Sequence, residues 1–171
     1  MAAQGQQLIA QGRIDEGIIE LERAAGAAPD DWTLAAQVGR IYLSASRLQR
    51  AEEFLSRSID RFPQAFDLWR LRGSSRLIQQ RWNEAAGDFR RALKLKPDDA
   101  SARSDLGFCL QQQGQFDSAK QEFTEAIRLD PALSTARLQF AKLLIVTHNA
   151  EDARKMLLEY LRLNPNSEEA L

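Results

Sequence analysis

Cysteine and histidine are nearly absent from this sequence of 171 residues, which contains one of each, Cys109 and His148. A single cysteine cannot form an intramolecular disulfide, and the pair is too few for a usual zinc site. A nucleophile–histidine pair would have to use His148, which falls in an expected turn between helices. The sequence therefore predicts no enzyme activity, no catalytic residues, no metal site and no bound cofactor.

Long apolar runs are also missing, because no stretch approaches the roughly 20 residues of a membrane-spanning helix. Residues 1–10 lack the basic segment followed by an apolar segment of a secretory signal. We expect no direct membrane insertion, and the compartment stays open between cytoplasm and periplasm. With 44% hydrophobic residues and a net charge of -1, the composition is that of a folded domain rather than a disordered chain.

The five prolines of the chain lie 34 residues apart, at Pro29, Pro63, Pro97, Pro131 and Pro165. Proline cannot continue a helix and disfavours helical geometry in the residue before it. A fixed period of this length is typical of stacked supersecondary units. We predict one domain, residues 1–171, with repeats at about 1–31, 32–65, 66–99, 100–133 and 134–167.

Within each period the pattern predicts a helix, a short turn and a second helix. Apolar residues of 100–133 recur at helical spacing, and Gly114 interrupts them where a helix would close with a positive φ. The equivalent turns are expected near residues 12, 46, 80 and 148. Gly5, Gly39, Gly73 and Gly107 are in register inside the first helices. Since glycine destabilises a helix by about 1 kcal/mol relative to alanine, we interpret these positions as close contacts between paired helices.

These residues resemble the tetratricopeptide repeat family over nearly the whole chain. Two repeats carry most of its pattern: Trp69, Gly73, Ala85, Phe89, Ala92 and Pro97 in one, and Leu106, Gly107, Ala119, Phe123, Ala126 and Pro131 in the next. The resemblance implies an all-α fold, a right-handed superhelical solenoid of five antiparallel helix pairs. It also implies a protein–protein interaction scaffold that binds a peptide or partner segment in a concave groove lined by first helices.

Projecting the family's groove positions onto this chain gives a set of candidate peptide-binding residues. They are Gln37, Arg40, Asp67, Arg70, Ser74, Asp105, Phe108 and Lys142. Residues 47–96 carry 12 basic and 6 acidic side chains, so we expect a protein or peptide partner, including one with acidic groups. We expect no nucleic acid, because the overall positive charge and the base-stacking motifs are missing.

An alternative from a different class is a docking or scaffold arm of a larger enzyme or of a bacterial polysaccharide-export machine. This alternative is an analogy at the level of the fold. The sequence of the regions flanking the repeats would distinguish it from a free-standing scaffold.

The end of the chain predicts a truncated array. Residues 168–171 match the start of a sixth repeat, with Ser167 as a candidate N-cap, and no polar capping helix follows. We expect Met156, Leu157 and Leu161 to be partly exposed and to promote end-to-end self-association.

Four further side chains have expected structural roles. Cys109 is expected to be a small buried residue, and His148 a solvated turn residue. Arg72 and Arg76 stand where neighbouring repeats have Val38 and Tyr42, and we expect their stems to pack while the guanidinium groups reach solvent.

Overall fold

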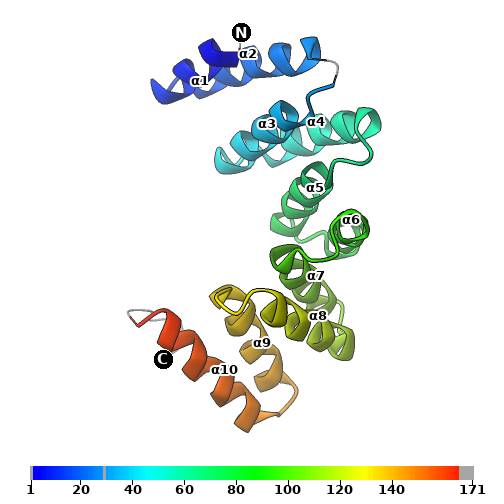
Figure 1. The fold of residues 1–171 in the computed structure, drawn as a ribbon, viewed down its shortest axis with the longest axis vertical. Coiled ribbons are helices and arrows are strands. Elements are labelled where there is room, and N and C mark those ends of the chain that lie inside the picture. The colour runs from blue at the N-terminus through cyan, green and yellow to red at the C-terminus, as the bar shows by residue number, and fades with distance from the viewer. Residues whose placement is uncertain (1, 29, 166–171) are drawn as a thin grey trace. The chain divides into compact units, whose positions relative to one another are not determined.

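The computed structural model describes residues 2–28 and 30–165, which form ten α-helices and no strand (Figure 1). The helices are α1 (Ala2–Ala10), α2 (Ile14–Ala27), α3 (Trp32–Ser44), α4 (Leu48–Arg61), α5 (Phe66–Ile78), α6 (Trp82–Leu95), α7 (Ala100–Gln112), α8 (Phe116–Leu129), α9 (Ser134–Val146) and α10 (Ala150–Leu163). The all-α prediction is confirmed. The predicted start of a sixth repeat, residues 168–171, and the N-cap at Ser167 lie outside the described residues.

The chain divides into two compact units, Met1–Arg81 and Trp82–Leu171. In the first unit α1 packs against α2, α3 against α4, and α5 against both α3 and α4. In the second unit α7 packs against α8, α9 against α10, and α7 also contacts α6 and α9. Consecutive helices joined by short turns are therefore the packing unit in each half.

Every turn inside a helix pair has the same geometry. The second residue after each first helix has a positive φ: Gly12 (79°), Ser46 (56°), Gln80 (59°), Gly114 (74°) and His148 (58°). The next amide then donates to the carbonyl five residues back, as from Arg47 to Tyr42 at 2.9 Å. This is the Schellman closure of a helix, which supplies donors to otherwise unpaired carbonyls. The five predicted turn positions are confirmed.

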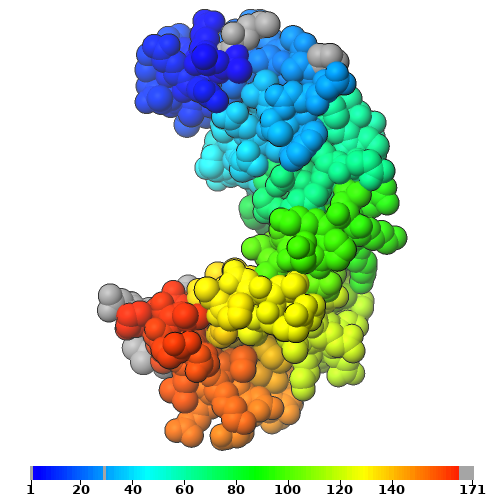
Figure 2. Space-filling view, viewed as in Figure 1, coloured from blue at the N-terminus to red at the C-terminus, as the bar shows by residue number. Residues whose placement is uncertain are grey.

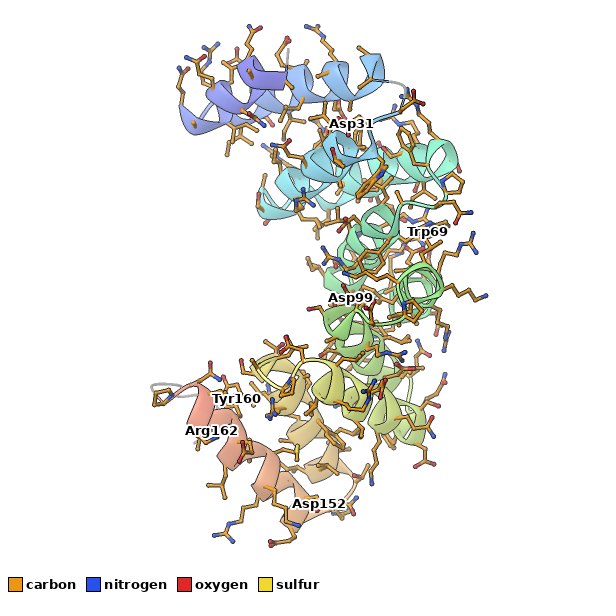
Figure 3. All side chains as sticks on the ribbon, viewed as in Figure 1. Asp31, Trp69, Asp99, Asp152, Tyr160 and Arg162 are labelled. Carbon is orange, nitrogen blue, oxygen red and sulfur yellow. The ribbon has the colours of Figure 1, made fainter. Side chains whose placement is uncertain are left out.

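Acidic residues at helix starts act as caps. The Asp31 carboxylate accepts from the backbone amide of Thr33 at 2.9 Å, and Asp99 accepts from the amide of Ala102 at 2.9 Å (Figure 3). The hydrogen bond from the Thr33 side chain also holds the pKa of Asp31 below its ordinary value. Capping of free amides explains these carboxylates without any acid–base chemistry.

The registered glycines lie where paired helices touch. A Cβ added at Gly39 would lie 2.7 Å from Cδ2 of Leu55, and one added at Gly107 would lie 3.0 Å from Cε1 of Phe123. Leu55 and Phe123 are fully buried. Glycine thus lets a large apolar side chain of the second helix reach the backbone of the first, and side chains fill the space that the ribbon leaves between the paired helices (Figure 2).

Candidate functional site

Five of the predicted groove residues lie on two neighbouring helices of the first unit. We call Gln37 and Arg40 on α3, with Asp67, Arg70 and Ser74 on α5, the α3–α5 set. Gln37 is half-buried, and its side-chain oxygen accepts from the amide of Gln6 on α1 at 3.5 Å. Arg40 is exposed. None of the five belongs to the buried apolar core of this unit.

Arg70 and Asp67 form a loose ion pair one turn apart on α5. Nη2 of Arg70 lies 3.5 Å from Oδ1 of Asp67, and about a quarter of the Arg70 side chain (26%) is exposed. The Ser74 hydroxyl donates to the backbone carbonyl of Arg70 at 3.0 Å. An ion pair of this length at the surface stabilises a helix by only about 0.3–0.5 kcal/mol. The Arg70 guanidinium can therefore exchange Asp67 for another carboxylate with little loss.

The other three predicted residues lie on neighbouring helices of the second unit. Asp105 and Phe108 are on α7 and Lys142 is on α9; we call these three the α7–α9 set. Phe108 is half-buried and packs edge-on against Trp82, with ring centroids 5.7 Å apart. Lys142 is exposed. Each unit thus brings its own predicted residues onto adjacent first helices.

The expectation for Arg72 and Arg76 was wrong, because both side chains bond to α4. Nη1 of Arg72 donates to the Ser56 hydroxyl at 3.1 Å, and Nε of Arg76 donates to Oε1 of Glu52 at 2.9 Å. Arg81 donates to the other oxygen of Glu52. Only 12% of the Glu52 side chain is exposed. A carboxylate this buried needs its cations, so Arg76, with only 16% of its side chain exposed, holds α5 against α4 instead of reaching solvent.

The hydrogen bonds to Glu52 also set its protonation. Burial alone would raise the pKa of this carboxyl, but the bonds from Arg76 and Arg81 lower it below the ordinary 4.5. The carboxylate is therefore charged at neutral pH. Sequence reasoning missed this cluster, although Glu52 occupies a place where neighbouring repeats have Ile18 and Ala86.

The two side chains with reactive potential lie in structural positions. Cys109 is fully buried, and burial raises the pKa of its thiol to about 12. His148 is exposed in the turn between α9 and α10. Both expectations for these residues are confirmed. Within residues 2–28 and 30–165 there is no cluster of three or more His, Cys, Asp or Glu that could hold a metal.

Two further surface properties bear on partners. Among the described helices, none has the length and apolarity that crossing a membrane requires. At α9 and α10 an apolar hollow of about 460 Å³ is lined by Ile145, Leu157, Leu158 and Leu161 among others. Leu157 and Leu161 are half-buried, whereas Leu158 is 56% exposed.

This chain resembles one known protein family and several solved structures over nearly its whole length. Tetratricopeptide repeat family models match residues 2–66, 76–124 and 112–171. No curated protein matches the sequence.

Three solved structures illustrate the likeness of fold. A crystal structure of MamA is 19% identical, covers 94% of both chains and has a TM-score of 0.83. MamA 41-end from Desulfovibrio magneticus RS-1 is 17% identical over 97% of this chain and 94% of its own, with a TM-score of 0.84. YrrB, described as a TPR protein with an unusual peptide-binding site, is 20% identical over 97% and 86%, with a TM-score of 0.78. The predicted fold class, an all-α solenoid of helix pairs, is confirmed.

Proposed function

Because this chain belongs to the tetratricopeptide repeat family, we propose that it is a protein-interaction scaffold whose first helices bind an extended peptide or partner segment. The proposal treats the chain as one domain of five repeats with the bounds that the proline spacing predicts. It gains support from the similar fold of YrrB, which is described as having a peptide-binding site. The α3–α5 set and the α7–α9 set are the proposed contact residues.

The observation that carries the proposal is that two cations on first helices, one in each unit, have no partner within the described part of the chain. Arg40 on α3 and Lys142 on α9 are exposed and form no hydrogen bond or ion pair with any described residue. Neither side chain contributes to the core of its unit. Charges that the fold itself does not use are available to a partner, and arginine is the side chain best suited to grip a carboxylate with two hydrogen bonds.

A peptide segment that carries carboxylates fits Arg40 in the first unit, and Lys142 offers the same chemistry in the second unit. Arg70 adds a third cation, since its contact with Asp67 is long and partly exposed. Charge complementarity of this kind mainly accelerates association and is weakened by salt.

The test is an array of extended acidic peptides probed with fluorescently labelled protein, followed by titration of the strongest binder. We expect Arg70→Ala to weaken binding by about 1.5–3 kcal/mol, the range for hydrogen bonds to charged groups. Arg40→Ala should have a smaller effect because the side chain is more exposed. The control is Lys94→Ala, an exposed cation on the second helix α6. Equal losses in the control and in Arg70→Ala would refute a first-helix site.

Self-association through the hollow at α9 and α10 also stays a proposal. Sedimentation velocity at several concentrations, with Leu158→Glu as the comparison, would reveal it as a concentration-dependent species that the variant lacks. A single monomeric species in both proteins would contradict it.

A further inference from the structure

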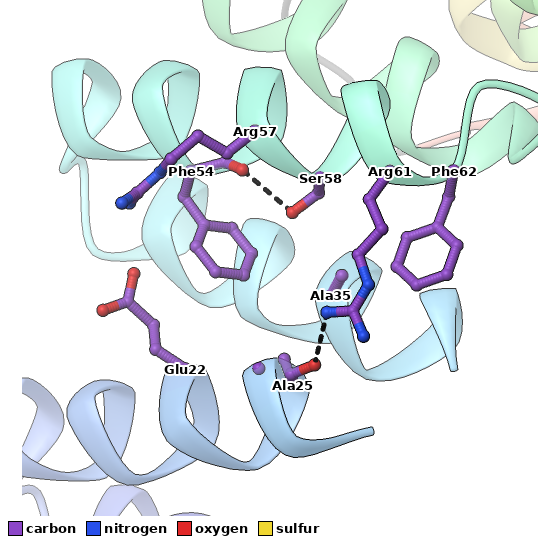
Figure 4. Close-up of a pocket in the computed structure, with 9 residues that line it drawn as sticks. Glu22, Ala25, Ala35, Phe54, Arg57, Ser58, Arg61 and Phe62 are labelled. Atoms are coloured by element: carbon purple, nitrogen blue, oxygen red, sulfur yellow. Dashed lines mark hydrogen bonds between the residues drawn. The ribbon is translucent and has the colours of Figure 1, made fainter. Parts of the chain in front are cut away.

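A cavity of about 250 Å³ lies between α2, α3 and α4 of the first unit. Figure 4 shows Phe54, Arg57, Ser58 and Arg61 of α4 on one side of it. Ala25 of α2 and Ala35 of α3 complete an apolar floor, and the two arginines stand one helical turn apart at its edge. This cavity is lined mainly by the second helices α2 and α4, and none of its lining residues belongs to the α3–α5 set.

Comparison with the other repeats explains why the space is empty here. At the place of Ala35, the following repeats have Trp69, Arg103 and Arg137. Each of these side chains donates to the carbonyl of the proline six residues earlier, with Nε1 of Trp69 lying 2.9 Å from the Pro63 oxygen. A long side chain thus lies over the turn between repeats in all three cases. Ala35 has no such side chain.

The neighbouring positions are also small in this repeat alone. Ala25 stands where the later repeats have Ile59, Leu93 and Ile127, and Gly26 stands where they have Asp60, Lys94 and Arg128. A Cβ added at Gly26 would meet no atom within 4 Å. Three small residues at one place therefore create the cavity. Since the next three repeats have Trp69, Arg103 and Arg137 at the place of Ala35, the cavity lies where those repeats have a large side chain.

The charged groups around the cavity differ in how many hydrogen bonds they already form. Arg57 is exposed and makes no hydrogen bond or ion pair with any residue that the structure describes. Cζ of Arg61 lies 5.1 Å from the centroid of the Phe62 ring. Nη1 of Arg61 donates to the Ala25 carbonyl oxygen in a long hydrogen bond of 3.4 Å. Glu22 already accepts a hydrogen bond from the Tyr42 hydroxyl at 2.9 Å. Burial, with the bond to Glu22, raises the pKa of Tyr42 to about 12, so the hydroxyl stays protonated and keeps this bond.

We propose that this cavity binds one aromatic side chain of a partner peptide, with an adjacent carboxylate of that peptide on Arg57. An engineered cavity of about 150 Å³ is enough to hold benzene, so this space accepts a benzyl or indole group. The ring would rest on Ala25, Ala35 and Phe54, and guanidinium groups at the edge favour both a π face and a carboxylate. Trp69 is the chain's own example of an aromatic ring at the matching place.

The probe is an N-acetylated, C-amidated pentapeptide, Gly-Asp-Trp-Glu-Gly, titrated into the ¹⁵N-labelled full chain. We expect amide shifts that cluster at Ala25, Gly26, Ala35 and Ser58. A peptide with Ala in place of Trp, and one with Asn and Gln in place of the acids, separate the contributions of ring and charge. Each change should weaken binding by about tenfold or less, in line with one aromatic contact or one exposed charged contact.

Three variants test the site from the protein side. Ala35→Trp supplies the side chain found in the third repeat and should abolish the shifts. Gly26→Asp adds the carboxylate that the second repeat has at Asp60. It should weaken binding by competing for Arg57, and its Cβ meets no atom within 4 Å. Arg57→Gln should weaken the acidic peptide about three- to tenfold and leave the peptide without acids unchanged.

Folding is checked by the far-UV spectrum and the melting temperature of each variant. If Ala35→Trp is destabilised, Gly26→Asp and Arg57→Gln decide the question. Arg70→Ala is the control, because Arg70 does not line the cavity. Loss of its side chain should leave these amide shifts unchanged. Shifts that vanish in Arg70→Ala but persist in Gly26→Asp and Arg57→Gln would overturn the cavity site while supporting the first-helix site. Absence of clustered shifts at millimolar peptide would also overturn it.

Discussion

Gly107→Ala tests whether the registered glycines are kept for helix contact. A methyl group at this position would lie 3.0, 3.1 and 3.2 Å from three ring atoms of Phe123. That ring is fully buried and stacked on Phe140, with centroids 6.0 Å apart, so it has little room to move. Alanine should gain about 1 kcal/mol in helix propensity, and overpacking should cost about 1–3 kcal/mol. We expect a net loss of up to about 2 kcal/mol in the free energy of unfolding.

Gly87→Ala is the matched control in the same unit. Gly87 lies in the middle of α6, is exposed, and an added Cβ meets no atom within 4 Å. Here only the propensity gain applies, so the variant should be stabilised by about 1 kcal/mol. The same chemical change is thus expected to have opposite signs at two helical glycines.

A double variant isolates the contact itself. The fifth repeat has Ala141 and Leu157 at the places of Gly107 and Phe123. Phe123→Leu alone should cost about 1–2 kcal/mol through lost packing. In the double variant the smaller side chain makes room for the methyl group. The double variant should therefore lose about 1 kcal/mol less stability than the sum of the two single losses.

The assay is urea unfolding followed by far-UV circular dichroism, with the slope of the transition compared between variants. Additive losses would show that the methyl group and the ring do not interact. Stabilisation by Gly107→Ala equal to that of Gly87→Ala would refute the close-contact interpretation outright.

Three other perturbations have defined outcomes. Hydrogen bonds keep the pKa of the Glu52 carboxyl below 4.5. The stability that the charged carboxylate contributes is therefore complete above that pH and is lost as the pH falls through the lowered pKa. Glu52→Gln should be less stable than the parent in urea melts at neutral pH, and the difference in stability should narrow below about pH 4. Cys109, whose thiol pKa is raised to about 12 by burial, should resist Ellman's reagent at pH 8 until urea unfolds the second unit; rapid labelling of the folded protein would contradict its buried position. Ser46→Gly should stabilise the chain by about 0.5–1 kcal/mol in a thermal melt, since Ser46 has a positive φ of 56° that glycine adopts without strain. Ala45→Gly, at a φ of -83°, should destabilise the chain in the same assay.

The periodic features of the fold were predictable from the sequence because each has a local cause. Proline ends a repeat by stereochemistry, which needs no partner. The turn at Gly114 was read from glycine itself, and the turns at Ser46, Gln80 and His148 from register alone, since none of these three is a glycine. Cys109 was assigned to the interior because a free cysteine usually behaves as a small buried apolar residue. At Ser46, Gln80 and His148 the 34-residue comparison replaced information that a single repeat lacks.

The Glu52 cluster was missed because it joins residues of different repeats. The expectation for Arg76 came from the matching positions of other repeats, where Tyr42 and Leu110 are buried. A buried stem with its guanidinium group in solvent was consistent with that comparison. The useful signal was a single charged residue, Arg76, in a column that is apolar in every other repeat. Such a residue predicts a partner of opposite charge nearby, because a charge alone would be costly to bury. It also means that Arg76 is committed to the fold and is a poor choice for testing ligand binding.

The two proposed sites differ in the kind of substitution that can reveal them. At the α3–α5 set the contact depends on side chains that are present, so truncating Arg70 removes it. At the cavity the contact depends on side chains that are missing, so truncation to alanine does not reach the feature that matters: Ala35 and Gly26 are already as small as, or smaller than, alanine. An alanine scan of the first unit would therefore report on lining side chains such as Phe54 and Arg57, and would not test the missing side chains that leave the space open. Substitutions that add volume, guided by the residues that the other repeats carry in the same column, are the ones that distinguish a binding cavity from an ordinary surface between helices.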